Sequence, residues 1–146
     1  MPEMPLPWML AGLAAAIGAL MGLMSLAVPR WGANVVRLAP HPEMHGGWAE
    51  FRASYGGALV LAHGAVLLTL AISAQAGAGA VMGASLAVGL YWLGMAIGRA
   101  VSMIMDAEQN TRTRYNAAAI GFEAVMGLAL CAPFLAHLDQ VPSQAV

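Results

Sequence analysis

Four long stretches that are almost free of charge constrain this chain more than any other feature of its sequence. Residues 8–28 contain no Asp, Glu, Lys or Arg over 21 positions, and three further apolar stretches follow at about residues 53–74, 78–105 and 116–135. A helix needs about 20 apolar residues to cross a hydrocarbon core of roughly 30 Å. Each stretch is therefore expected to form one membrane-spanning helix.

The composition agrees with a protein whose solvent is the lipid bilayer. Hydrophobic residues occupy 60% of the 146 positions, and charged residues only 9%. The length suits one domain, so we expect residues 1–146 to form a single all-α, integral-membrane four-helix bundle. A formal net charge of −1 provides no basic surface, and nucleic acid is not an expected partner.

The connections between the stretches predict how the helices follow one another. Residues 29–52 are too polar and too rich in Pro and Gly to span, and a short interfacial helix is expected near residues 31–38, followed by an irregular loop. Residues 75–77 allow only a tight turn, so the second and third spans must form an antiparallel hairpin. Because no Lys or Arg precedes the first stretch, we expect a retained span rather than a cleaved signal peptide.

Small residues recur every four positions within the apolar stretches. They are Ala14, Gly18 and Gly22 in the first, and Gly79 with Gly83 and Gly94 with Gly98 in the third. Such spacing lets helix backbones approach closely in lipid. It predicts close contacts within the bundle, with another membrane protein, or both.

The basic residues predict an orientation. All six lie at or near the end that carries the two longer loops: Arg30, Arg37, Arg52, Arg99, Arg112 and Arg114. Even without Arg52 and Arg99, which have candidate internal partners, four remain at this end and none at the other. The positive-inside rule then places loops 29–52 and 106–115 in the cytoplasm and both termini in the periplasm.

Polar residues at this same end form the candidate site. They are Glu50, Arg52 and Tyr55 at the head of the second stretch, Arg99, Ser102 and Asp106 late in the third, and Glu123 in the fourth. Arg99 and Glu123 each lie about six residues, or about 9 Å, inside their helices from the loop end. A charge near mid-bilayer costs about 2.5 to 3.5 kcal/mol when it is unpaired, so we expect these two to form a salt bridge that the other five residues extend.

His63 is a second candidate, because it falls near the middle of the second stretch. A histidine at membrane depth is a candidate haem or metal ligand or proton carrier, but we favour a helix-to-helix hydrogen bond. His63 and His137 differ by roughly 15 Å in depth and cannot share one iron. His41 and His45 lie in a segment broken by Pro and Gly. The sequence therefore predicts no cofactor and no metal site.

These motifs resemble a family of small bacterial four-span membrane proteins known only as a domain of unknown function. The resemblance rests on Glu50-x-Arg52-x-x-Tyr55-Gly56-Gly57, on Gly98-Arg99 with Ser102 and Asp106, and on Glu123. It extends over about residues 8–136. It implies four helices in a bacterial inner membrane, and it implies no activity.

Three functions are compatible with these patterns. The sequence favours a non-catalytic accessory or scaffold protein that packs against a larger membrane complex or forms a homo-oligomer. The alternative is an intramembrane binder or carrier of a proton, an anion or an amphipathic small molecule, using the polar cluster. An intramembrane enzyme with Tyr55, Asp106 or Glu123 as acid or base is disfavoured, since the sequence has no Ser-His-Asp arrangement and no phosphate-binding glycine loop.

Overall fold

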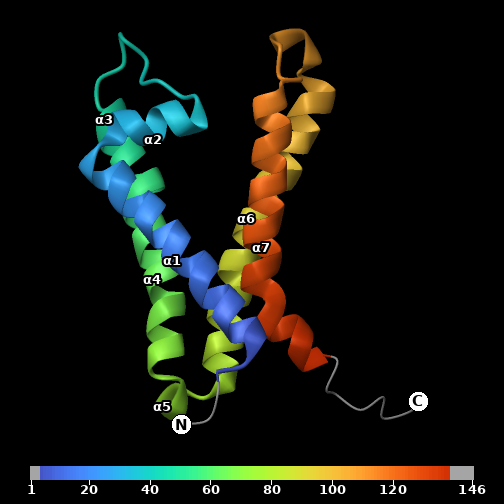
Figure 1. The fold of residues 1–146 in the computed structure, drawn as a ribbon. Helices are drawn as coiled ribbons and strands as arrows, with labels where there is room; N and C mark the ends of the chain where they lie inside the picture. The colour runs from blue at the N-terminus through green and yellow to red at the C-terminus, as the bar shows by residue number, and fades with distance from the viewer. Residues whose placement is uncertain (1–3, 139–146) are drawn as a thin grey trace.

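The protein is an all-helical bundle, as its apolar stretches predict. The computed structural model describes residues 4–138, and this part of the chain contains no strand. Four helical segments are long and apolar enough to cross a membrane: Leu6–Ala27, Gly47–Ala71, Ala78–Met105 and Arg114–Leu138. The described chain is thus a multi-pass membrane protein with a four-helix fold (Figure 1).

The spans agree with the sequence-based ranges in number and order. The first is α1 (Leu6–Ala27), the third is α6 (Ala78–Met105) and the fourth is α7 (Arg114–Leu138), while the second is a continuous run of α3 (Gly47–Phe51), the π-helix η1 (Arg52–Gly57) and α4 (Ala58–Ala71). The second span begins at Gly47 rather than near residue 53. Hydropathy marks where the apolar part of a helix begins, whereas backbone hydrogen bonding continues into the polar interface.

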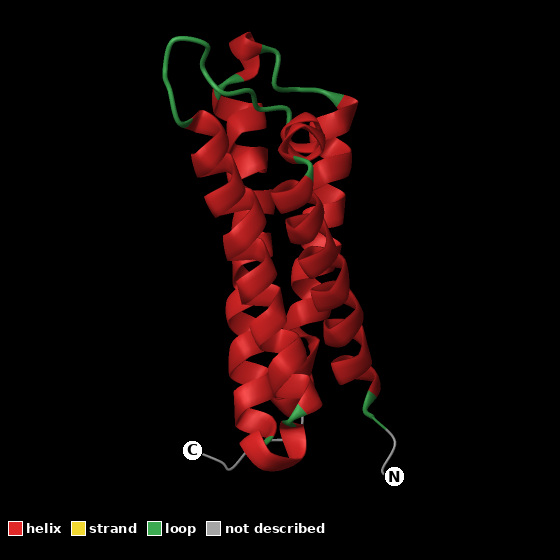
Figure 2. Ribbon diagram, turned by 90° about the vertical axis from the view of Figure 1, so that its left-hand side faces the viewer, coloured by secondary structure: helices red, strands yellow, loops and turns green. Residues whose placement is uncertain are grey.

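Short helices form the connections at both ends of the bundle (Figure 2). The expected interfacial helix is α2 (Pro29–Val36), which begins with a proline in its first turn and ends at Arg37 in a left-handed conformation. At the opposite end α5 (Ser73–Ala76) and Gly77 form the turn into α6, and Gly77 has a φ of 79° that suits glycine. The 3-10 helix η2 (Ala107–Gln109) lies between α6 and α7.

The four spans are arranged as two helix pairs, α1 with α4 and α6 with α7. The pairs meet near the chain termini and diverge toward the end that carries α2 and η2, called here the loop end (Figure 1). The buried apolar core occupies the half near the termini, and its members are Ala14, Ala15, Val66, Leu70, Val81, Val88, Trp92, Met126 and Leu130. The space between the pairs at the loop end is therefore outside this core.

Glycines bring the two helices of each pair into close contact. A methyl group built on Gly18 of α1 would overlap the ring of His63, and one built on Gly22 would lie 2.8 Å from the backbone nitrogen of Val60. In the other pair, methyl groups on Gly89 and Gly127 would each lie 2.9 Å from the other residue's carbonyl oxygen. The small residues of the first span are thus used inside the bundle.

The glycines predicted to form close contacts on the third span behave differently. Methyl groups built on Gly79, Gly83 and Gly94 would have no protein atom within 4 Å among the described residues, and all three glycines are exposed. This face of α6 points away from the bundle. Any close contact that this face makes therefore involves something other than residues 4–138.

Replacing Gly18 with Ala is expected to lower the free energy of unfolding of the detergent-solubilised protein by about 1 to 3 kcal/mol. The added methyl group overlaps the ring of His63 and pushes α1 away from α4. The control is Gly64→Ala, whose methyl group has open space and whose higher helix propensity should keep stability equal or slightly higher. Thermal unfolding of the two variants and the wild type measures their stabilities. Equal stability of the two variants would contradict the described packing of α1 on α4.

Candidate functional site

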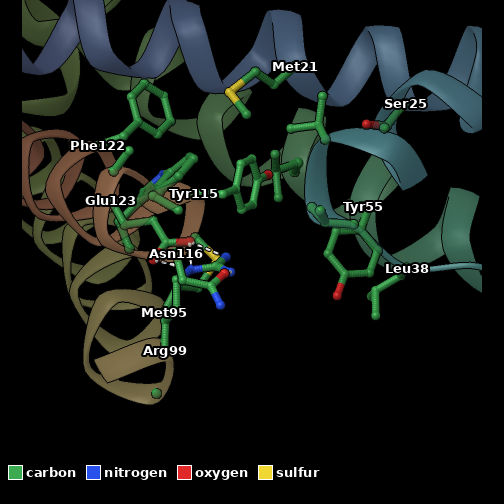
Figure 3. A pocket seen from close by; sticks show the side chains of 18 of the residues that line it. Met21, Ser25, Leu38, Tyr55, Met95, Arg99, Tyr115, Asn116, Phe122 and Glu123 are labelled. Atoms are coloured by element: carbon green, nitrogen blue, oxygen red, sulfur yellow. Dashed lines mark hydrogen bonds and ion pairs between the residues drawn. The ribbon is translucent and has the colours of Figure 1, made fainter. Parts of the chain in front are cut away.

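A cavity of about 590 Å³ lies between the two helix pairs at the loop end (Figure 3). Its lining comes from α1, α2, η1, α4, α6 and α7, so every span contributes. Six of the chain's ten aromatic residues line it, including all three tyrosines: Trp31, Tyr55, Tyr91, Trp92, Tyr115 and Phe122. This volume is within the range of about 300 to 1,000 Å³ that is typical of small-molecule sites.

The salt bridge expected between α6 and α7 forms one wall of the cavity. Arg99 Nη2 donates to Glu123 Oε1 at 2.7 Å, and Arg99 Nε lies 3.1 and 3.2 Å from the two carboxylate oxygens. The side chain of Glu123 is 6% exposed and that of Arg99 is 25% exposed. Glu123 is therefore a buried charge that has its partner at the same depth, as the counting of helical turns predicts.

Polar contacts extend this pair toward the α6–α7 loop. Arg99 Nη1 donates to Asn116 Oδ1 at 3.3 Å, and Asn116 Nδ2 donates to the carbonyl oxygen of Thr111 at 2.6 Å. The hydroxyl of Thr111 in turn donates to the carbonyl oxygen of Ser102 at 3.0 Å. The loop and both helices are thus held together, and the charged wall has a fixed geometry before any ligand binds.

The structure brings together four of the seven predicted site residues. Tyr55, Arg99, Ser102 and Glu123 all line the cavity. Tyr55 lies on the opposite side from the salt bridge (Figure 3), and its ring stacks on Phe51 at a centroid distance of 4.7 Å. The phenol is therefore held in place by an aromatic neighbour and not by the ion pair.

The other three predicted residues lie outside the cavity. Glu50 accepts a hydrogen bond from Ser54 Oγ at 2.6 Å, and Arg52 Nε donates to the carbonyl oxygen of Leu26 at 3.0 Å. Leu26 is in the last turn of α1, where carbonyl groups lack helical partners, so Arg52 caps that helix. Asp106 is exposed because α6 ends at Met105, which removes Asp106 from the helix face of Arg99 and Ser102.

His63 makes the helix-to-helix hydrogen bond that we favoured. Its side chain is fully buried, its Nδ1 lies 2.7 Å from the carbonyl oxygen of Leu59, and its Nε2 lies 2.8 Å from Trp92 Nε1. An indole N–H can only donate, so Nε2 accepts and Nδ1 carries the proton of a neutral ring. Both ring nitrogens are occupied, which leaves none for haem or a metal ion.

The contact with His63 also shapes the cavity. Trp92 lines the cavity and packs edge-on against Phe122, with ring centroids 5.7 Å apart. His63 therefore positions an aromatic residue at the junction between the core and the cavity. Within residues 4–138, no group of three or more His, Cys, Asp and Glu side chains is placed to hold a metal ion.

The most informative residues that sequence reasoning missed are aromatic. Tyr91 and Trp92 stand together near the middle of the third span, and two side chains with polar tips at that depth were a usable signal. Tyr115 had no such signal. Its ring lies under the guanidinium of Arg37, at 3.8 Å from Cζ to the ring centroid, and this contact joins the end of α2 to the start of α7 across the cavity rim.

Comparisons of the chain with protein-family models, with curated proteins and with solved structures gave no match. The resemblance to a family of small bacterial four-span proteins therefore stays a prediction. The site has to be interpreted from its own geometry.

Removing only one partner of the salt bridge should destabilise the protein more than removing both. Glu123→Leu leaves Arg99 unpaired and should cost about 2 kcal/mol or more, a figure that allows for the partial exposure of Arg99. The double variant Arg99→Met with Glu123→Leu should recover most of that loss, because neither charge then remains. Thermal unfolding of the wild type, Arg99→Met, Glu123→Leu and the double variant gives the coupling energy between the two residues. Additive losses in the double variant would contradict the pairing.

Proposed function

We propose that this protein binds an amphipathic small molecule in the cavity between its two helix pairs. The observation that carries the proposal is the composition of the cavity, in which aromatic and aliphatic side chains surround one fixed ion pair. Small-molecule sites are mostly apolar with a few placed polar groups. The bilayer around the chain is a source of molecules with both an apolar and a polar part.

The geometry favours this ligand class over a proton. Glu123 already accepts three hydrogen bonds from Arg99, so both of its carboxylate oxygens are engaged within the protein. A proton carrier needs a carboxylate with an oxygen that is accessible to the donor and the acceptor of the proton. The cavity also has far more volume than a proton or a small inorganic ion requires.

We further propose that the chain resides in a bacterial inner membrane, with the loop end in the cytoplasm and both termini in the periplasm. The bacterial membrane is what the resemblance of the motifs implies. The arginine distribution supports the orientation, because all six arginines lie in the loop-end half of the bundle. In this orientation the cavity lies at the cytoplasmic edge of the membrane.

Single cysteines test the orientation. Cys131 is the only cysteine, so Cys131→Ala gives a background for Gln75→Cys at the turn and Gln109→Cys at the loop end, both at exposed positions. A membrane-impermeant maleimide should label Gln75→Cys in intact spheroplasts and Gln109→Cys only after permeabilisation. The opposite pattern would reverse the proposed topology.

Filling the cavity tests the binding function. Gly98 lines the cavity and has no protein atom within 4 Å of an added methyl group, so Gly98→Leu should occupy the cavity without displacing a helix. Gly83→Leu is the control on the same helix, on the outward face. Mass spectrometry of organic extracts should show a co-purifying amphiphile in wild type and Gly83→Leu, and at least about ten-fold less in Gly98→Leu, equivalent to about 1.4 kcal/mol. Equal amounts in all three samples would contradict the proposal.

An accessory role in a larger complex or homo-oligomer is the second candidate function. It is favoured by the outward face of α6, where Gly79, Gly83 and Gly94 leave room for a closely packed helix. The same two variants separate the functions, since Gly83→Leu should remove a cross-linked partner that Gly98→Leu retains. A chain that is monomeric and without partner in mild detergent would contradict this role.

A further inference from the structure

The charged groups around the cavity leave one positive charge uncompensated. Among the lining residues only Arg99 and Glu123 carry full charges, and they neutralise each other. Arg37 lies at the rim, between the lining residues Val36 and Leu38, and no carboxylate within residues 4–138 forms a salt bridge with it. Glu50 is in an adjoining hollow of about 440 Å³, where it accepts the hydrogen bond from Ser54.

Some of the polar groups around the cavity can only donate hydrogen bonds, and the others can both donate and accept. Several polar side chains that line it have no side-chain hydrogen bond within the described part of the chain: Trp31, Tyr55, Tyr91, Ser102 and Tyr115. The indole N–H of Trp31 and the guanidinium of Arg37 can only donate. Glu123, the single carboxylate of the lining, is already engaged by Arg99. A ligand with acceptor oxygens therefore suits Trp31 and Arg37, and the hydroxyl groups of the lining can donate to the same oxygens.

Arg37 is held at the cavity rim in a position where it can bind the anionic group of a ligand. It has a φ of 57° at the end of α2, which directs the chain out of the helix, and its guanidinium lies over the face of Tyr115. A cation–π contact uses the face of the guanidinium and leaves its N–H groups free for an anion in the same plane. Because Tyr115 is on α7, an anion bound there lies where the two helix pairs face each other.

From the charge, the donors and the position of Arg37, and resting on the proposed function, we propose that the ligand is an anionic amphiphile whose carboxylate or phosphate head group binds Arg37. Its hydrocarbon part lies among Met21, Leu59, Met95 and Phe122. A cationic head group would meet two guanidinium groups and a carboxylate that is already paired. A neutral head group would form no oppositely charged pair with Arg37, which is exposed at the rim.

Probes that share one hydrocarbon chain and differ in head group test this inference. The protein is placed in phosphatidylcholine nanodiscs, and its thermal unfolding is followed during titration with myristate, tetradecyl phosphate, tetradecanol and tetradecyltrimethylammonium. Both anionic probes should stabilise the wild type in a saturable manner, with apparent affinities at least about ten-fold higher than the neutral and cationic probes. Inorganic phosphate alone should not change the unfolding temperature. The relative affinities of myristate and tetradecyl phosphate identify whether a carboxylate or a phosphate head group fits better.

Arginine variants assign the effect to one residue. Arg37→Gln should reduce the affinity for the anionic probes at least about ten-fold, while Arg37→Lys keeps the charge and should retain the preference for anions. Arg114→Gln is the matched control, because Arg114 is exposed at the same end of the bundle but does not line the cavity. It should bind like wild type. If Arg37→Gln also lowers the unfolding temperature without ligand, the comparison of Arg37→Lys with wild type still measures head-group preference.

Two results would overturn the inference. The first would leave the proposed binding function intact, and the second would contradict that function as well. If all head groups bind equally well to wild type and Arg37→Gln but more weakly to Gly98→Leu, the cavity binds amphiphiles without selecting anions. If no probe distinguishes Gly98→Leu from Gly83→Leu, the cavity binds none of them, and the proposed function fails with the inference.

Discussion

A single buried hydrogen bond, from Trp92 to His63, joins the two helix pairs at the level where the closed core ends and the cavity begins. The arrangement depends on Gly18, since any side chain there would occupy the space of the imidazole ring. In a bilayer there is no water to satisfy the histidine, so both of its nitrogens have protein partners. A polar residue in an apolar span thus fixes the relative position of α4 and α6.

At the loop end of the bundle, the arginines have different kinds of partner. Arg99 neutralises a buried carboxylate, whereas Arg52 and Arg112 donate to the carbonyl oxygens of Leu26 and Met103 near the ends of α1 and α6. Cations near helix C-termini offset the negative end of the helix dipole, so these two residues stabilise helix ends as well as favouring an orientation. Within the described residues Arg37 has neither kind of partner, so its charge is available to a ligand.

Much of the fold was accessible from the sequence, because apolar length alone determines the number of spans and helical rise places Arg99 level with Glu123. The limits of that approach appear at particular residues. Asp106 shares a helix face with Arg99 only if α6 continues, and α6 ends one residue earlier. The cavity depends on the angle between the helix pairs, which results from the side-chain volumes of all four spans together. The contact of Arg37 with Tyr115 depends on the direction in which the chain leaves α2, and no local pattern specifies that direction.

The π-helix η1 lies between α3 and α4 in the second span and changes the direction in which their side chains point around the helix axis. A π-turn contains an extra residue relative to an α-turn, so the side chains before η1 are rotated about the helix axis relative to those after it. Arg52 and Gly56 thereby meet α1 at Leu26, and Tyr55 faces the cavity, while α4 keeps the phase that directs His63 toward Trp92. The side chains of α3 and η1 can therefore point in a different direction around the helix axis from those of α4. The hydrogen bond between Trp92 and His63, which joins the two helix pairs, is kept.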